Sequence, residues 1–438
     1  MDDRKGQTDD QPASKDQQLC IVQHAGTRQS VELSRPVSIL HTETQRACGL
    51  TPQSVTLLGH YLRDTASFLA MTSLRDNPYV TVLMPLGYTD DILMHGLLAL
   101  SGALLTYRQP GNVDLANATR LHYGKLISGL RGEFVDLEND DLEKKERLLR
   151  ISLVACHYEA VSGDTHGTFF AHLRASQTLV HQLPPKYAPD LLHRSTMGLS
   201  METLTYLMIC NTITPSGFAA DCTMPLNDFF ASLDDSLPTF GALFAGAHEL
   251  YRMIPDVSLL ASQRLTEETA GPIHPSLSLK SAHDSLHQRI TCWTMPPPPL
   301  DDNTDDWEHK RNSAEAYRHA LHIYLATALS GSTVSDPAVK SHIEQHIIRV
   351  FKYVVQLVAS QYTATLLWPT VVAGSCMTKA SHREALVSGM SGDRWRMRQV
   401  KVLVDVLQLL WDDPDPRAYG PYGLQLIMEK HGIKISIS

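Results

Sequence analysis

Three pairs of histidines have the spacing of residues that share one face of a helix: His283/His287, His319/His322 and His342/His346. Imidazoles three or four residues apart on a helix could bind a transition metal together. None of the pairs carries the glutamate of an H-E-x-x-H motif, and the sequence indicates no third ligand. We therefore expect these histidines to make surface or interhelical hydrogen bonds, without a metal.

A run of acidic residues could hold magnesium ions. Asp301-Asp302-Asn303-Thr304-Asp305-Asp306 resembles the aspartate-rich motif of terpene cyclases, in which carboxylates on one helix face bridge metal ions to a diphosphate. Here the run follows Pro296–Pro299, it contains Asn and Thr, and no second metal motif lies downstream; Asn227-Asp228 is in the wrong order. We expect a solvated loop over these residues.

Other motifs of enzyme chemistry are missing from the sequence. It has no G-x-S-x-G, no G-x-G-x-x-G and no P-loop, so no cofactor is indicated. The seven cysteines are scattered, and the closest two, Cys210 and Cys222, lie twelve positions apart. Without a C-x-x-C pair, neither a structural zinc site nor a redox site is predicted, and the dispersed set indicates reduced, buried thiols.

The composition describes an ordinary globular protein. Hydrophobic residues make up 43% of the 438 positions and charged residues 19%, which predicts a large buried core. The net charge of −9 argues against a broad nucleic-acid surface. The longest apolar run, Ile92–Tyr107, is too short for a membrane span and is interrupted by His95. The first twenty residues have no apolar signal core, so we expect no secretion.

Hydrophobic spacing predicts an all-α protein with one large irregular multi-helix domain over residues 51–438. Residues 1–50 are polar and without a sustained period, so we expect disorder there. A Pro/Asp-rich linker is expected near 295–311. The alternating Lys434–Ser438 is interpreted as a short C-terminal segment that belongs to no sheet. Besides helices that begin after Thr51 and Asp91, helical patterns cover 114–131, 141–162, 165–183, 200–212, 240–262, 276–291, 312–330, 338–363, 380–388 and 392–411.

Two local signals are specific enough to test. Thr51-Pro52 has the form of an N-cap followed by a proline at the first helical position. Asp90 or Asp91 can cap the next long helix, which is apolar nearly all round and is therefore expected to be buried. Leu97 and Leu100 on that helix are predicted core residues.

Six stretches resemble, in order along the chain, the helical regulatory domain of fungal zinc-cluster transcription factors. They are Asp91–Tyr107, Gly163–Leu173 (GDTHGTFFAHL), Ala247–Leu260, Ala314–Leu329, Leu366–Gly374 and Val400–Leu410. The resemblance implies an α-helical domain that binds effectors and self-associates. It also implies a homodimer or a partner transcription factor, and a nuclear location, otherwise a cytoplasmic one. In the second stretch, Gly163 is expected to make a turn and Asp164 or Thr165 to cap the helix that follows.

The sequence departs from that family in its N-terminal part. The family's DNA-binding module needs six closely spaced cysteines around zinc, and such modules do not fold without the metal. Only Cys20 and Cys48 occur before residue 150. We therefore expect no direct DNA contact through a zinc cluster.

Two functions remain open on the sequence alone, with a pure scaffold as a third class. The first is a transcription-factor-like regulatory protein without its own DNA-binding module, which controls or assists a fungal secondary-metabolite pathway and binds a small apolar effector between helices. The alternative is an enzyme that reuses the cavity, such as a cyclase or pericyclase, and acts by orienting a reactive polyene substrate. Candidate polar residues of such a cavity are His157, His166, His172, Tyr324 and Trp368.

Overall fold

Every regular element of the described residues is a helix, which confirms the all-α prediction. The computed structural model describes residues 51–72, 76–135, 137, 141–183, 191–215, 241–271, 274–297, 304–357, 360 and 365–438. Within them the only extended pairing is a single bridge between His166 and Lys434. None of the described helices is long and apolar enough to cross a membrane. The disorder expected for residues 1–50 concerns positions outside the described residues.

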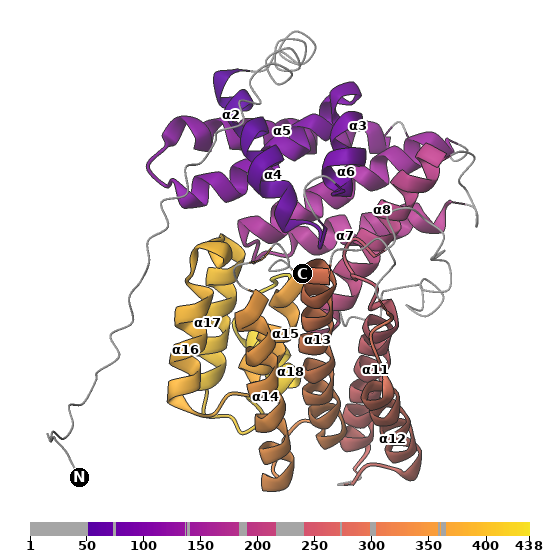
Figure 1. Ribbon diagram of the computed structural model, residues 1–438, viewed down its shortest axis with the longest axis vertical. Helices are drawn as coiled ribbons and strands as arrows, with labels where there is room; N and C mark the ends of the chain where they lie inside the picture. The colour runs from indigo at the N-terminus through magenta and orange to yellow at the C-terminus, as the bar shows by residue number, and fades with distance from the viewer. Residues whose placement is uncertain are drawn as a thin grey trace, which may run out of the picture. The chain divides into compact units, whose positions relative to one another are not determined.

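The first group of helices packs around α4 (Asp91–Arg108), which contacts α2, α5 and α6 (Figure 1). Leu97 and Leu100 are fully buried, as their all-round apolar helix predicts. The remaining elements of this group are α2 (Pro52–His60), η1 (Tyr61–Thr65), η2 (Ala66–Phe68), η3 (Tyr79–Leu83), α3 (Met84–Thr89), α5 (Val113–Val135), α6 (Leu142–Ser162), α7 (Thr168–His181), α8 (Leu191–Cys210) and η4 (Asn211–Ile213).

Local capping chemistry sets where several of these helices begin. The Thr51 hydroxyl accepts a hydrogen bond from the Ser54 amide, with Pro52 in the first turn of α2. The Asp90 carboxylate accepts from the amides of Ile92 and Leu93 at the start of α4. Both caps were predicted from the sequence, and Asp90 is the residue that caps α4.

The second group of helices packs around α13 (Thr304–Ser330), which contacts α11, α12, α14, α15 and α18. Figure 1 shows α13 between α11 and α14, with α16 and α17 side by side. The other elements are α11 (His248–Ala270), α12 (Leu277–Cys292), α14 (Pro337–Leu357), α15 (Leu367–Ser375), α16 (Ala380–Met390), η6 (Asp393–Trp395), α17 (Arg398–Asp412) and α18 (Gly420–Lys430).

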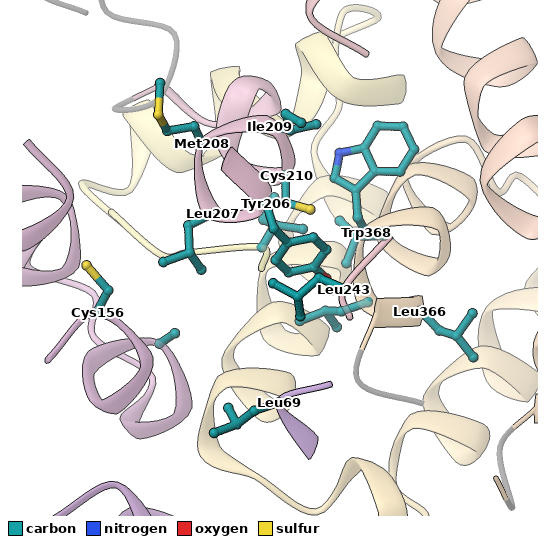
Figure 2. Close-up of a cluster of buried hydrophobic side chains, with 14 of the residues drawn as sticks. Leu69, Cys156, Tyr206, Leu207, Met208, Ile209, Cys210, Leu243, Leu366 and Trp368 are labelled. Atoms are coloured by element: carbon teal, nitrogen blue, oxygen red, sulfur yellow. The ribbon is translucent and has the colours of Figure 1, made fainter. Parts of the chain in front are cut away.

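One continuous core joins the two groups of helices. Helix α6 contacts α17, and α8 contacts α11. Figure 2 shows part of this core, with Leu69 just after η2, Tyr206 of α8 and Trp368 of α15, and with Leu243 and Leu366 among the buried neighbours.

The turn between α6 and α7 has the structure that its sequence predicts. Gly163 ends α6 with a φ of 68°, a conformation that suits glycine. The Asp164 carboxylate accepts hydrogen bonds from the amides of His166, Gly167 and Phe169, so Asp164 caps the approach to α7. The Thr165 carbonyl instead accepts from the Lys434 amide.

The linker near 295–311 is shorter than expected. Helix α13 begins at Thr304, so Thr304–Asp306 belong to its first turn and not to the solvated loop predicted for the acidic run. Asp301–Asn303 lie outside the described residues. A helix can begin in an acidic segment because carboxylates are stabilised near its N-terminus.

Three further details differ from the prediction. Helices α15 and α18 were not predicted as helices. The C-terminal residues are packed into the fold: Ile435 and Ile437 are fully buried, and the Ile437 amide donates a hydrogen bond to the Asn211 side chain. The thiols of Cys156, Cys210 and Cys376 are buried as expected, whereas Cys292 is exposed.

Candidate functional site

Of the five candidates from the sequence, only Tyr324 and Trp368 meet. Their ring centroids lie 6.4 Å apart in an edge-to-face arrangement. Trp368 is fully buried and stacks on Tyr317 at 5.4 Å, and its indole Nε1 has no hydrogen-bond partner among the described residues. Burial raises the pKa of Tyr324 to about 12. Both residues are packed within the core.

The three histidine candidates lie apart from that pair and from one another. His157 on α6 is buried, and its Nε2 lies 3.3 Å from the Tyr79 hydroxyl. Burial lowers the pKa of His157 to about 4, so its ring is neutral at pH 7. His166 is exposed in the turn before α7, and His172 is half-buried on α7. The five candidates therefore do not form one site.

The centre of the molecule is filled by aromatic side chains. Tyr251 lies between Phe244 and Tyr317, at ring distances of 4.8 and 4.3 Å. The cavity beside this cluster, lined by His157 and Tyr206 among others, has a volume of about 60 Å³. That volume admits only a few water molecules, so this cavity is too small for a polyene.

A larger apolar recess lies between α14, α15 and α16, and we call it the α14–α16 groove. Its volume is about 330 Å³, within the range of small-molecule sites. Most of its wall is aliphatic or aromatic, and two of the large apolar side chains of α14 near it are exposed: Ile348 by 56% and Val355 by 72%. Exposed apolar surface next to a concave site favours an apolar occupant.

Two polar side chains interrupt the apolar wall of the groove. Thr370 is 1% exposed, and its hydroxyl has no hydrogen-bond partner among the described residues. A buried hydroxyl without a partner is costly, and a bound ligand could satisfy it. The second polar side chain is His382, whose Nδ1 lies 3.2 Å from a Glu344 carboxylate oxygen. Few, well-placed polar groups on an apolar wall are typical of ligand sites.

The groove exists because α14 has an apolar face wider than its core contact. Ile343, Ile347, Val350 and Val354 recur at helical spacing and are buried. Ile348 and Val355 lie one position further along and extend that face into solvent. Part of the apolar stripe is thus left uncovered beside α16.

The three histidine pairs converge between α12, α13 and α14. The His319 and His346 rings share a hydrogen bond between their Nδ1 atoms, 3.0 Å apart, which links α13 to α14. The His346 ring lies 4.7 Å from that of His322 and 4.6 Å from that of His342. His322 in turn lies 5.2 Å from His287 of α12. Interhelical hydrogen bonding was the expected role of these side chains.

This histidine cluster is held neutral by its surroundings. Burial, followed by the charges of Arg318 and Arg349, lowers the pKa of His319 to about 4. Burial and the neighbouring histidines lower the pKa of His322 to about 3 and that of His346 to about 2. Among the described residues no three His, Cys, Asp or Glu side chains are arranged to hold a metal ion.

The sequence of the chain agrees with a known family. The sequence profile of the fungal specific transcription factor domain matches residues 56–422. The chain belongs to this family. The fungal specific transcription factor domain therefore includes the α14–α16 groove, the histidine cluster and the turn at Gly163. No curated protein and no solved structure matches the chain.

Sequence reasoning missed the groove residues of this fungal transcription factor domain. The stretch Leu366–Gly374 was recognised, but its Thr370 looked like any polar residue near a core helix. The signal in the sequence was the pair of apolar positions Ile348 and Val355, which lie beside the main apolar stripe of α14. Marking every apolar position of this helix would have found them.

Proposed function

We propose that this chain is a transcription-regulatory protein whose helical domain binds a small apolar effector in the α14–α16 groove. Membership of the fungal specific transcription factor domain family supports the regulatory role. The observation that carries the effector site is the groove itself, about 330 Å³ in volume, with the unpartnered hydroxyl of Thr370 on its apolar wall. An effector there would bridge α14 and α16 and so could alter how the surface of this domain is presented.

The proposal includes a nuclear location and control of a secondary-metabolite pathway, as the family resemblance implies. The 438 residues contain no set of cysteines for a zinc cluster. We assign the contact with DNA to a partner transcription factor, or to an assembly that includes a second copy of this chain. The net charge of −9 is consistent with action through a protein partner.

A neutral apolar dye tests the groove. Gly389 of α16 lines it, and a Cβ at Gly389 would meet no atom within 4 Å. Gly389→Leu should therefore fill the groove without a clash, and should favour the helix, since glycine is a poor helix former. We expect Nile red fluorescence to show saturable binding to the natural chain and at least about tenfold weaker binding to this variant.

Gly132→Leu is the matched control for the dye experiment. Gly132 is also an exposed helical glycine, on α5, and its added Cβ would likewise meet no atom within 4 Å. Nile red should bind this variant like the natural chain. Equal binding to the Gly389→Leu variant would show that the groove is not the site.

The biological role is tested by deleting the gene. A regulator acts on transcript levels, so deletion should change the transcripts of target genes, and added pathway intermediates should not restore the product. An enzyme acts on a molecule, so its deletion would leave transcripts intact while a precursor accumulates. Conversion of that precursor by the purified protein alone would overturn the regulatory proposal in favour of the cyclase alternative.

A further inference from the structure

A second and larger recess separates the N-terminal helices from α17, and we call it the cationic cleft. Its volume is about 900 Å³. One wall comes from α4, α5 and α6, and includes Tyr107, Arg120 and Tyr158; the other comes from the end of α16, η6 and the start of α17. The cleft is open to solvent, and its volume is within the range of small-molecule sites.

The charge of the cleft is opposite to that of the chain. Arg120, Arg396, Arg398 and Lys401 line it, and no Asp or Glu is among its lining residues, although the net charge of the chain is −9. A concave surface lined by one sign of charge attracts the opposite sign.

Most of this positive charge is not neutralised by neighbours. Arg396 and Arg398 are exposed, and in the described part of the chain neither makes an ion pair. Arg120 donates a hydrogen bond to the neutral side chain of Asn117. Lys401 is the exception, since its ammonium lies 2.9 Å from Asp405. Unpaired guanidinium groups can bind a carboxylate or phosphate through two parallel hydrogen bonds.

The arginine stems are held in place by the fold. Arg398 starts α17 and packs against the turn at Gly163, where an added Cβ would lie 3.0 Å from the Arg398 Cγ. Glycine at this position lets α6 and α17 approach closely. The turn at Gly163 therefore brings the two walls of the cleft together.

Aromatic surface accompanies the charge. Tyr158 stacks on Tyr123 with ring centroids 4.0 Å apart and 14° between the planes, which fixes the orientation of its ring at the cleft. Tyr107 and Trp395 also line the cleft. Aromatic faces beside guanidinium groups suit a ligand with a flat apolar body and an acidic group.

We propose that the cationic cleft binds a small organic anion with an aromatic or polycyclic body and a carboxylate or phosphate group. The enclosed volume and the acidic chain favour a small molecule over a nucleic acid, which needs an extended basic surface. The cleft adjoins the α14–α16 groove, since Met390 and Trp395 line both recesses, but the four basic residues line the cleft and not the groove. The inference does not depend on the groove holding an effector.

An anionic dye tests this assignment. We expect 8-anilinonaphthalene-1-sulfonate to bind with a fluorescence increase, measured on the Gly389→Leu variant so that the groove does not contribute. Adding Arg396→Gln and Arg398→Gln should weaken binding at least about tenfold, as loss of two charge-assisted contacts implies. Both arginines are exposed, so the fold should tolerate the change. Binding should also weaken at high salt.

The control removes two positive charges elsewhere. Lys125 on α5 and Lys280 on α12 are exposed and line neither recess. Lys125→Gln with Lys280→Gln should leave binding of the anionic dye unchanged.

Two outcomes would overturn the proposal. The first is that the Arg396→Gln, Arg398→Gln variant binds the anionic dye as tightly as the protein with both arginines. Tight binding of duplex DNA that is lost with the same arginines would overturn the small-molecule assignment in favour of nucleic-acid contact. Loss of Nile red binding in the Gly389→Leu variant tests the groove, and loss of anionic dye binding in the Arg396→Gln, Arg398→Gln variant tests the cleft, so the two proposals can fail separately.

Discussion

At the scale of single residues, Glu202 holds a segment of chain far from it in sequence. This residue of α8 is fully buried, and its carboxyl oxygens accept hydrogen bonds from the amides of Gly241, Leu243 and Phe244. Burial raises the pKa of Glu202 to about 8, while the hydrogen bonds from these amides favour its charged form.

Replacing Glu202 should therefore depend on what replaces it. Glu202→Ala leaves buried amides without acceptors and should lower the free energy of unfolding by ~3–5 kcal/mol. Glu202→Gln keeps the shape and one acceptor oxygen, and should cost roughly 1–2 kcal/mol. Urea unfolding of both variants measures the difference. Equal costs would show that the hydrogen bonds to Gly241, Leu243 and Phe244 do not stabilise the fold.

Residue roles could be predicted where the partner is near in sequence. Thr51, Asp90 and Asp164 cap helices within a few residues of themselves, and local geometry dictates such contacts. The burial of Thr370 and the partner of His346 depend on which helices meet, and nothing in the local sequence indicates this. For that reason the sequence showed the histidine pairs but not their convergence.

At the scale of elements, α4 is the helix on which the first group packs. Leu97 is fully buried and would lie about 3.0 Å from a Cβ added at Gly87 of α3, which shows how tightly the two helices meet. Leu97→Ala should lower the free energy of unfolding by ~2–5 kcal/mol, through lost transfer energy and a cavity. Urea unfolding with an unchanged slope would measure it.

Leu121→Ala provides the comparison on the neighbouring helix. Leu121 of α5 is 56% exposed, so its truncation should change stability by no more than about 0.5 kcal/mol. A small effect at both positions would mean that α4 is peripheral to the core.

Long periodic helices were predictable, and short ones were not. Helix α6 (Leu142–Ser162) differs by one residue at its start from the predicted 141–162. Helix α15 is nine residues long and buried throughout, so it has no period to detect. Its Pro369 is tolerated because it lies in the first turn. The buried residues 435–437 are held by side chains of η4 and α17, which a local pattern does not reveal.

At the scale of the whole molecule, buried neutral histidines make the fold sensitive to acid. His122 of α5 bonds to Ser54 of α2, and His319 bonds to His346 across α13 and α14. Burial lowers the pKa of His122, His157 and His319 to about 4, from 6.5 in a solvated histidine. The folded protein keeps these rings neutral at a pH where the unfolded chain protonates them.

Below pH 6.5 the unfolded state therefore binds more protons than the folded state, so the free energy of unfolding decreases as the pH is lowered. As the pH falls, each such histidine lowers the free energy of unfolding by up to ~1.4 kcal/mol per pH unit until its folded-state pKa is reached.

His322 provides the test of this acid sensitivity. It is 7% exposed, its Nδ1 has no partner among the described residues, and its pKa is lowered to about 3. His322→Leu should keep or raise stability at pH 7 and flatten the loss between about pH 6 and 4. The control is His166→Leu at an exposed position, which should change neither the stability at pH 7 nor its loss at lower pH. Urea unfolding at several pH values measures the natural chain and both variants. A loss that is equally steep in the His322→Leu variant would mean that the acid sensitivity arises from the carboxyl groups and not from this cluster.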